Sequence, residues 1–361
     1  MNRRKFIKTA SQSVAAAMLP QTLSAYATDR YDWKLISSFP KSNSIMATVV
    51  DSLSQRIEQM SCGRIRITCY PPESIKDDPF DAVSSGKIEI GIGCPFFWIN
   101  KHDAFLFCSH FPFGLNAHEL MTWLQFNGGM QLLDDVYSHF NLKVFPLGNT
   151  GTQMGGWFTT EIHSVDDFKG LKIRFSGIGG EILKQLGATR INLSSDNLLE
   201  GLQSKKIDAC SGFGPFEDLA LGLHQGAEFY YWPGWHEPGI LFDLFMHKAA
   251  YDSLPNDLKQ IICHAALSMY NHIWSLYTNH NSNALITLVK QHKVTIKRFP
   301  DRVLIILAKL THKLIPEMAS KNPLSKKIYD SYMLFRNKYM GWSQVSEEAF
   351  TITRSMTDCY L

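Results

Sequence analysis

The sequence lacks long hydrophobic runs and carries almost balanced charge. No stretch of about 18 residues is free of polar side chains, so no membrane-spanning helix is predicted. There are 36 Lys and Arg residues against 33 Asp and Glu residues, which gives a formal net charge of +3. A nucleic-acid-binding domain usually has a pI above about 9 and clustered basic residues. Nucleic acid is therefore not expected as a partner.

The sequence also lacks the common signatures of catalytic and cofactor sites. It has no Walker loop, no G-x-S-x-G motif and, among its 13 histidines, no H-E-x-x-H motif. Three G-x-G pairs occur, but the third glycine of a dinucleotide-binding motif is replaced by Phe96, Ile182 or Glu217. No catalytic constellation remains, so the sequence predicts a protein that is not an enzyme.

The seven cysteines form no C-x-x-C pair, which excludes zinc-ribbon and thioredoxin-like sites. Their odd number also argues against a complete set of disulfides. Most are expected to be small buried residues, although the sequence leaves their pairing open.

Residues 1–27 have the features of an export signal. Four basic residues and no acidic residue accompany a short apolar stretch at 14–19, and an A-x-A cleavage pattern ends at Ala27. The motif NRRKFIK at 2–8 is similar to the twin-arginine export signal. We therefore expect a periplasmic protein that is cleaved near Ala27. Removal of those four basic residues leaves 32 Lys and Arg against 33 Asp and Glu, a net charge of −1.

The rest of the chain alternates short apolar stretches with amphipathic ones, which is typical of an α/β fold. Long helices are predicted at 43–61, at 116–137 and from Pro255 onward, where apolar residues recur every three or four positions. Strands are predicted at 33–38, 64–70, 87–92, 143–147, 171–175, 189–192, 207–210, 228–231, 240–246 and 294–299.

Two segments rich in glycine or proline, 148–156 and 233–239, divide this pattern. We interpret them as crossings between two α/β lobes, because the segment between them has strands and helices of its own. One large domain with mobile loops is the alternative. A small ligand would bind in a cleft between the lobes. The predicted parts are a first lobe at 28–150, completed by about 240–300, a second lobe at 151–239, and a helical segment at 301–361 that packs on the lobes or on a partner protomer.

Arg174 is the strongest candidate for binding an anion. In the predicted strand LKIRF the apolar residues alternate, so Lys172 and Arg174 share one face. A glycine-rich turn, SGIGG at 176–180, then opens a helix whose first N–H groups are unpaired and carry partial positive charge. An arginine at that point can hold a carboxylate through two parallel hydrogen bonds. The alternative is a surface pair between Arg174 and a nearby acid.

Both crossings contain residues that suit ligand or cation binding. Asn149 and Gln153 are amides in a glycine-rich segment, where the backbone can approach a ligand closely. Glu237 lies among aromatic residues and can contribute to an oxygen-rich cation site. The alternatives are a flexible crossing and an ordinary solvated glutamate at a hinge. Phe97 and Trp98 can form the wall of a pocket, although such an aromatic cluster is more often part of a core.

Three motifs together resemble the solute receptors of tripartite ATP-independent periplasmic (TRAP) transporters. They are the segment 148–158, GLKIRFSGIGGEIL at 170–183 and PGWHEPG at 233–239, and the likeness extends from about Trp33 to Tyr332. The branch that it resembles most binds 2-oxo acids, lactate and related monocarboxylates. The resemblance implies a two-lobed periplasmic-binding-protein fold, similar to type II, that closes over one carboxylate ligand and delivers it to a membrane permease.

Within this resemblance, Arg174 would clamp the carboxylate of the ligand, and Asn149 would assist it. Phe97, Trp98 and Phe213 are the aromatic residues that we expect in the ligand pocket. Together with Gln153, these residues make up the predicted ligand site, and none of them is assigned a catalytic role.

The resemblance also implies a Na⁺ or Ca²⁺ ion that bridges protein and ligand, with Gln153 and Glu237 beside it. The sequence departs from the family pattern here, because Ser211 stands where a metal-binding Glu is expected and Gly212 replaces a Trp that lines the pocket. A lost carboxylate should lower the affinity for a cation, and a lost indole should open the pocket. A larger ligand, an absent cation and replacement by Glu217 are the alternatives. No cofactor is predicted to be obligatory.

We therefore predict an exported receptor that binds a small organic acid without chemical turnover and delivers it to a TRAP permease. The alternative is a periplasmic sensor or interaction protein that has lost transport, or an enzyme on the same fold. The apolar stripes on the helices after about residue 300 are compatible with a homodimer. The sequence alone does not decide between a monomer and a dimer.

Overall fold

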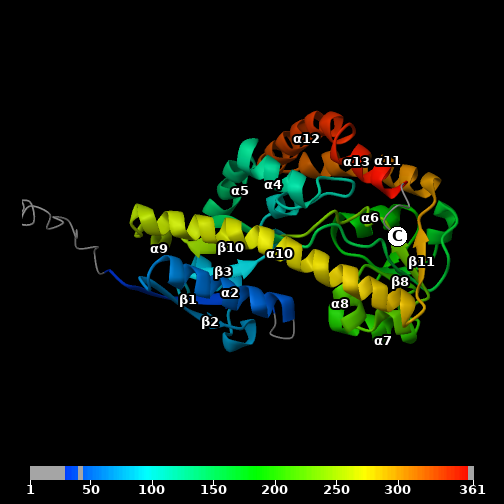
Figure 1. Ribbon diagram of the computed structural model, residues 1–361. Helices are drawn as coiled ribbons and strands as arrows, with labels where there is room; N and C mark the ends of the chain where they lie inside the picture. Colours follow the sequence, from blue (N-terminus) through cyan, green and yellow to red (C-terminus); the bar gives the residue numbers. More distant parts are fainter. Residues whose placement is uncertain (1–28, 40–43, 357–361) are drawn as a thin grey trace, which may run out of the picture.

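The computed structural model describes residues 29–39 and 44–356, so the predicted export signal lies outside the described residues. The described residues form two β-sheets, each covered by helices, and a group of long C-terminal helices (Figure 1). The mixed α/β class predicted from the sequence is confirmed. None of the helices in this part of the chain has the length and apolar character that a bilayer crossing needs.

The first sheet has five strands in the order β2-β1-β3-β10-β4. They are β1 (Tyr31–Ser37), β2 (Ile65–Tyr70), β3 (Ile90–Gly93), β4 (Leu142–Asn149) and β10 (Leu241–His247), and their main helices are α2 (Ser44–Met60), α3 (Pro79–Ser84) and α10 (Asn256–Lys290). β1 pairs in parallel with β2 and β3, whereas β10 lies antiparallel between β3 and β4. Leu35 and Ile90 pack with α2 and α10, while Ile36 and Phe245 pack with Phe80 of α3, so both faces of the sheet are buried.

The second sheet has six strands in the order β11-β9-β5-β8-β6-β7. They are β5 (Gly156–Phe158), β6 (Lys172–Arg174), β7 (Thr189–Arg190), β8 (Ala209–Cys210), β9 (Phe229–Trp232) and β11 (Thr295–Arg298), with helices α6 (Gly177–Gln185), α7 (Leu198–Gln203) and α8 (Pro215–Ala220). β6 is parallel to β7 and β8, and β5 is antiparallel to β8 and β9. The two glycine- and proline-rich segments do cross between the sheets, because β4 and β10 belong to the first and β5 and β9 to the second.

Helix α10 makes a third connection between the sheets. Its 35 residues correspond to about 50 Å, and Ile262 lies in the core of the first sheet whereas Leu288 lies in that of the second (Figure 1). The helix therefore delivers β11 to the second sheet, where it pairs in parallel with β9. The sequence assigned residues up to about 300 to the first lobe, and the structure differs there. The reason is the length of α10, which carries the chain past the first sheet.

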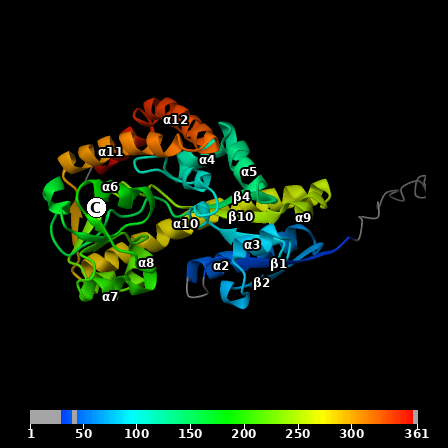
Figure 2. The same cartoon turned by 180° about the vertical axis from the view of Figure 1, so that it is seen from behind.

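The C-terminal helices lie across both halves of the molecule. They are α11 (Asp301–Ala319), α12 (Pro323–Ser343) and α13 (Glu347–Ser355). α11 packs on α6, while α12 packs on helices of the first half, α4 (Ala117–Phe126), α5 (Gly129–Ser138) and η3 (Asp103–Phe107), as both views show (Figures 1 and 2). The backbone N–H of Leu115 donates to the Tyr332 hydroxyl at 2.5 Å, and the Trp123 indole donates to Ser331 at 3.1 Å. These hydrogen bonds fix α12 on the first half.

One long predicted helix is divided in the structure. Residues 116–137 form α4 and α5 rather than one helix, because Gly128 adopts a left-handed conformation with φ 82°. The six described cysteines are free, and Cys359 lies outside the described residues. The remaining elements are η1 (Pro72–Ser74), η2 (Pro95–Trp98), η4 (Val165–Phe168), η5 (Ser195–Asn197), η6 (Leu223–Gln225) and α9 (Lys248–Asp252).

Candidate functional site

Arg174 ends strand β6 and is held by neutral groups. Ile173 is fully buried, so the alternation of the strand directs Arg174 away from that core face. Its Nε donates to the Leu193 carbonyl at 3.2 Å, and one terminal nitrogen lies 3.5 Å from the Ser195 hydroxyl. Burial lowers the pKa of Arg174, while the nearby Glu237 carboxylate acts in the opposite direction. The side chain remains a cation that can offer its other N–H groups to an anion.

The two crossings run side by side. The backbone N–H of Gln153 donates to the Glu237 carbonyl at 3.2 Å, and that of Thr150 donates to the Ile240 carbonyl at 3.1 Å. Gly234 lies against the Gln153 backbone so closely that a Cβ there would overlap it. This pairing explains why residues far apart in the sequence form one site.

Gln153 and Glu237 meet at the centre of these crossings. Gln153 is 5% exposed, and its side-chain amide faces the Phe213 carbonyl at 3.0 Å and Glu237 Oε2 at 2.6 Å. With its nitrogen turned toward them, the amide donates to both oxygens. With its oxygen turned toward them, three acceptor oxygens converge, which is the arrangement that a hard cation such as Na⁺ or Ca²⁺ requires. The donor set therefore fits a hard cation.

The charge state of Glu237 depends on its partners. Burial raises the pKa of Glu237 to about 7, and the Arg174 guanidinium opposes this shift. Among the described residues, no group of three or more His, Cys, Asp and Glu side chains could hold a metal. A cation at this position would therefore rely on Glu237, the Gln153 amide and backbone oxygens.

Asn149 is the last residue of β4 and is fully buried. Its Oδ1 accepts a hydrogen bond from the Gly151 N–H at 2.9 Å, which shapes the start of the crossing. Its Nδ2 is buried beside the Tyr270 hydroxyl without a hydrogen bond of normal geometry. The amide N–H groups can therefore serve an incoming acceptor oxygen.

Ser211 and Gly212 follow β8, directly beside Arg174. The Ser211 N–H donates to the Arg174 carbonyl at 3.0 Å, and Ser211 is buried. The missing indole at Gly212 predicts an open space beside this residue. The structure differs, because a Cβ at Gly212 would overlap the Asp218 carboxylate. Asp218 accepts hydrogen bonds from the Trp157 indole at 2.9 Å, the Tyr230 hydroxyl at 2.7 Å and the Phe213 N–H at 2.9 Å.

Glu217 does not lie where it could replace the missing metal-binding glutamate. Its carboxylate hydrogen-bonds Tyr277 of α10, and one oxygen, Oε2, is buried without a partner in the described structure. Burial raises the pKa of Glu217 to about 7, with a further contribution from Asp218. Glu217 therefore contacts α10 and not the Gln153 amide.

The predicted aromatic residues are placed differently from one another. Trp98 is 2% exposed and packs on Phe80 and Phe245, with ring centroids 4.8 and 5.7 Å away, so it is a core residue rather than part of a pocket wall. Phe97 is 42% exposed beside Phe39. Phe213 contributes its backbone N–H to Asp218 and its carbonyl to Gln153. Only Phe213 joins the cluster around Gln153.

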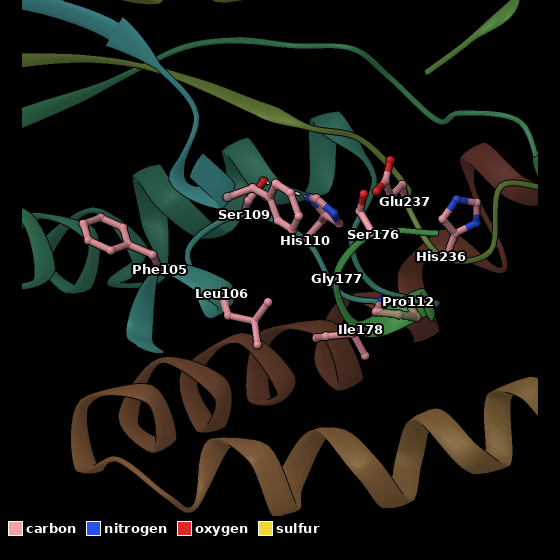
Figure 3. Close-up of a pocket in the computed structure, with 12 residues that line it drawn as sticks. Phe105, Leu106, Ser109, His110, Pro112, Ser176, Gly177, Ile178, His236 and Glu237 are labelled. Atoms are coloured by element: carbon pink, nitrogen blue, oxygen red, sulfur yellow. Dashed lines mark hydrogen bonds between the residues drawn. The ribbon is translucent and has the colours of Figure 1, made fainter. Parts of the chain in front are cut away.

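A pocket adjoins this cluster (Figure 3). It is a small cavity of about 20 Å³ between the segment around η3, the first turn of α6 and the second crossing. No sequence motif indicated the pocket residues around η3, such as His110. The lining residues are Phe96, Phe105, Leu106, Ser109, His110, Pro112, Ser176, Gly177, Ile178, Gly179, His236 and Glu237.

Comparisons with known proteins agree with this arrangement. The family model for bacterial extracellular solute-binding proteins, family 7 (DctP), matches residues 36–322. The chain is 32% identical over 360 residues to the monocarboxylate 2-oxoacid-binding periplasmic protein of Nostoc sp. (strain PCC 7120), covering 97% of this chain and 98% of that protein.

Solved structures of TRAP periplasmic solute-binding proteins share the fold. The protein from Colwellia psychrerythraea, with bound calcium and pyruvate, superposes with a TM-score of 0.84 at 33% identity, covering 90% of this chain and 99% of that one. The protein from Pseudoalteromonas atlantica T6c, with bound sodium and pyruvate, gives 0.81 at 32%, covering 89% and 98%. A dimeric protein from Bordetella bronchiseptica RB50, with calcium and picolinate, gives 0.83 at 30%, covering 91% and 98%.

Proposed function

Because the chain belongs to family 7 of the bacterial extracellular solute-binding proteins, we propose that it holds a 2-oxo acid or a related monocarboxylate at Arg174 and passes it to a TRAP membrane permease. It is a solute receptor and not an enzyme. The observation that carries the proposal is the half-buried Arg174 guanidinium, paired with neutral groups beside Glu237. A partly desolvated cation without an acid in direct contact has affinity for a carboxylate ligand.

Ligand binding would draw together two lobes, one built on each sheet. Arg174 belongs to the second sheet, Asn149 to the first, and Gln153 to the crossing between them. A ligand that contacts all three residues binds the closed form more tightly than the open form. The difference between these two binding free energies shifts the population toward the closed form. The two crossings and α10 are the connections about which the lobes would move.

The cation would bridge the ligand and the protein. Glu237, the Gln153 amide and the Phe213 carbonyl supply oxygens on one side, and the ligand's carboxylate would supply more. Ser211 adds no charge to this set. The relatives that contain calcium or sodium together with pyruvate support this arrangement.

A thermal-shift screen of mono- and dicarboxylates tests the proposal. Pyruvate or another 2-oxo acid, at about 100 times its Kd, is expected to stabilise the protein by about 2.7 kcal/mol. Ca²⁺ or Na⁺ is expected to raise the ligand affinity about 5- to 150-fold, the usual range of coupling between two sites. Unchanged melting with every organic acid would remove the proposed function.

Glu237→Gln separates the cation from the ligand clamp. The variant keeps an oxygen but loses the charge, so ligand binding should persist while its dependence on Ca²⁺ falls. Glu73→Gln, on the exposed η1 helix, is the matched control and should keep the full dependence. The same Ca²⁺ dependence in Glu237→Gln and the control would show that Glu237 is not a cation ligand.

The N-terminal segment would deliver the receptor to its compartment. The family to which the chain belongs is extracytoplasmic. We propose that residues 1–27 act as a twin-arginine signal that is removed near Ala27. The basic residues, the apolar stretch and the A-x-A pattern occur in the order that such a signal requires.

We further propose a homodimer through the C-terminal helices. Five large apolar side chains of α12, α13 and their adjoining residues are at least 62% exposed: Leu334, Trp342, Val345, Phe350 and Met356. A relative at 30% identity is a dimer in its crystal. A second copy of the same patch would cover these side chains.

Light scattering after size-exclusion chromatography measures the mass of the protein in solution directly. The wild-type protein is expected to have the mass of two chains, and Trp342→Glu to have the mass of one, because a buried charge opposes association. Ile286→Glu, on an exposed position of α10, should leave the mass unchanged. A wild-type mass of one chain at micromolar concentration would contradict the dimer.

A further inference from the structure

The pocket in Figure 3 contains polar groups that the carboxylate clamp does not use. Arg174 is not among its lining residues, so the pocket would hold the part of a ligand beyond its carboxylate. Its cavity volume is about 20 Å³, which is enough for about one water-sized group. The pocket therefore suits one small polar group of a ligand rather than a long side chain.

The His110 side chain can act as a hydrogen-bond donor toward the pocket. The Ser109 hydroxyl oxygen accepts from the Leu241 N–H at 3.1 Å and lies 3.0 Å from His110 Nδ1 (Figure 3). In the tautomer in which the Ser109 hydroxyl donates to Nδ1, the ring proton is on Nε2 and is available to a ligand. Burial lowers the pKa of His110 to about 4, which keeps the ring neutral.

Other donors surround the same space. Ser176 precedes α6 but makes no side-chain cap, so its hydroxyl is not used by the helix. The first N–H groups of α6 also begin here. Figure 3 shows His110, Ser176 and Glu237 drawn close together, with Leu106 and Ile178 on another side of the pocket. An alkyl chain alone would bury the donors without partners, which costs free energy.

The charged groups around the pocket limit which oxygen group of a ligand can bind there. Among the described residues that line the pocket, none is Lys or Arg, and the half-buried Glu237 lies at its edge. A second carboxylate would lose its hydration and meet only the partial positive charge of the α6 N-terminus, with no Lys or Arg side chain to pair with. A hydroxyl or carbonyl oxygen has no such penalty and can accept from His110.

We propose that this pocket selects a monocarboxylate whose side chain carries an uncharged oxygen, and that His110 donates a hydrogen bond to that oxygen. The proposal rests on the proposed function and specifies its ligand. His110 is then the residue that determines specificity, and Ser109 is a positioning residue that acts through it.

Calorimetry with three ligands on the wild-type chain tests the proposal without any variant. 4-Hydroxy-2-oxobutyrate is expected to bind about tenfold tighter than 2-oxobutyrate, the effect of one hydrogen bond of about 1.4 kcal/mol. 2-Oxoglutarate is expected to bind more weakly than either. Equal binding of the first two, or tightest binding of 2-oxoglutarate, would overturn the proposal while leaving the receptor function intact. Absence of binding by every monocarboxylate would instead remove the function itself.

Variants then assign the preference to His110. His110→Leu is expected to remove the tenfold difference and to keep pyruvate affinity within about twofold, whereas His110→Gln, which keeps an N–H donor, retains part of the difference. His118→Leu, at an exposed position of α4, is the matched control and retains all of it. A preference that survives in His110→Leu overturns the role of His110. If that variant does not fold, the ligand series on the wild-type chain and His110→Gln decides the question.

Discussion

Replacing Arg174 with alanine is expected to lower the affinity for any carboxylate ligand by about 30-fold or more, because loss of one partner of a buried charge pair costs 2 kcal/mol or above. The fold should remain, since the Arg174 side chain contributes only two hydrogen bonds, to Leu193 and Ser195. Arg174→Lys should recover part of the affinity, because a lysine keeps the charge but not the two parallel donors. Isothermal titration calorimetry measures the affinity, and thermal melting checks the fold.

The matched control for Arg174 is Arg298→Ala on β11. Arg298 is half exposed and pairs with Asp301 at 2.7 Å on the surface, where an ion pair contributes little. Its removal should leave the ligand affinity unchanged. Equal affinities in the wild-type protein and Arg174→Ala would mean that the carboxylate binds elsewhere.

Replacing Asp218 with alanine is expected to destabilise the protein by at least about 3 kcal/mol, because three buried donors lose their acceptor. The donors belong to Trp157, Tyr230 and Phe213, and the rings of Trp157 and Tyr230 stack at 4.0 Å. Burial raises the pKa of Asp218 to about 6, and these hydrogen bonds act against that shift. Urea denaturation measures the free energy of unfolding.

A double-mutant cycle connects Asp218 with Gly212. Gly212→Ala alone is expected to cost about 1 to 3 kcal/mol, because its Cβ would overlap the Asp218 carboxylate. In the Asp218→Ala background the same change should cost less than about 0.5 kcal/mol. Gly341→Ala has no neighbour within 4 Å and should be neutral or stabilising. Equal costs of Gly212→Ala in both backgrounds would show that the two residues do not compete for space.

The cycle also tests how the departure from the family pattern is accommodated. The missing indole at Gly212 does not leave a larger pocket, because the Asp218 carboxylate occupies the space beside that residue. The Phe213 N–H is held by the same carboxylate, and the Phe213 carbonyl faces Gln153. Asp218 therefore stabilises the segment that lies against the candidate cation site.

Local patterns predicted most of the elements and placed the candidate anion-binding residue within them. Alternation in LKIRF placed Arg174 at the end of a strand before a helix, and the structure has β6 and α6 there. Both crossings were recognisable because glycine and proline interrupt the periodic stretches. Such features depend on residues that are neighbours in the chain.

Features that depend on distant contacts were not predictable. The pairing of β11 with β9 follows from the length of α10, which periodicity does not limit. The burial of Trp98 and the position of Asp218 over Gly212 depend on tertiary packing. The sequence contains no motif around Ser109 and His110, and the 3.0 Å contact between their side chains depends on the tertiary structure.

The central claim is that one monocarboxylate binds each chain at Arg174, between the two sheets. Calorimetric titration of the mature protein with pyruvate, in the presence of Ca²⁺, tests it most directly. The account predicts saturable binding of one pyruvate per chain, weakened about 30-fold or more in Arg174→Ala and unchanged in Arg298→Ala. Absence of saturable heat with pyruvate and with longer 2-oxo acids, or undiminished binding by Arg174→Ala, would contradict it.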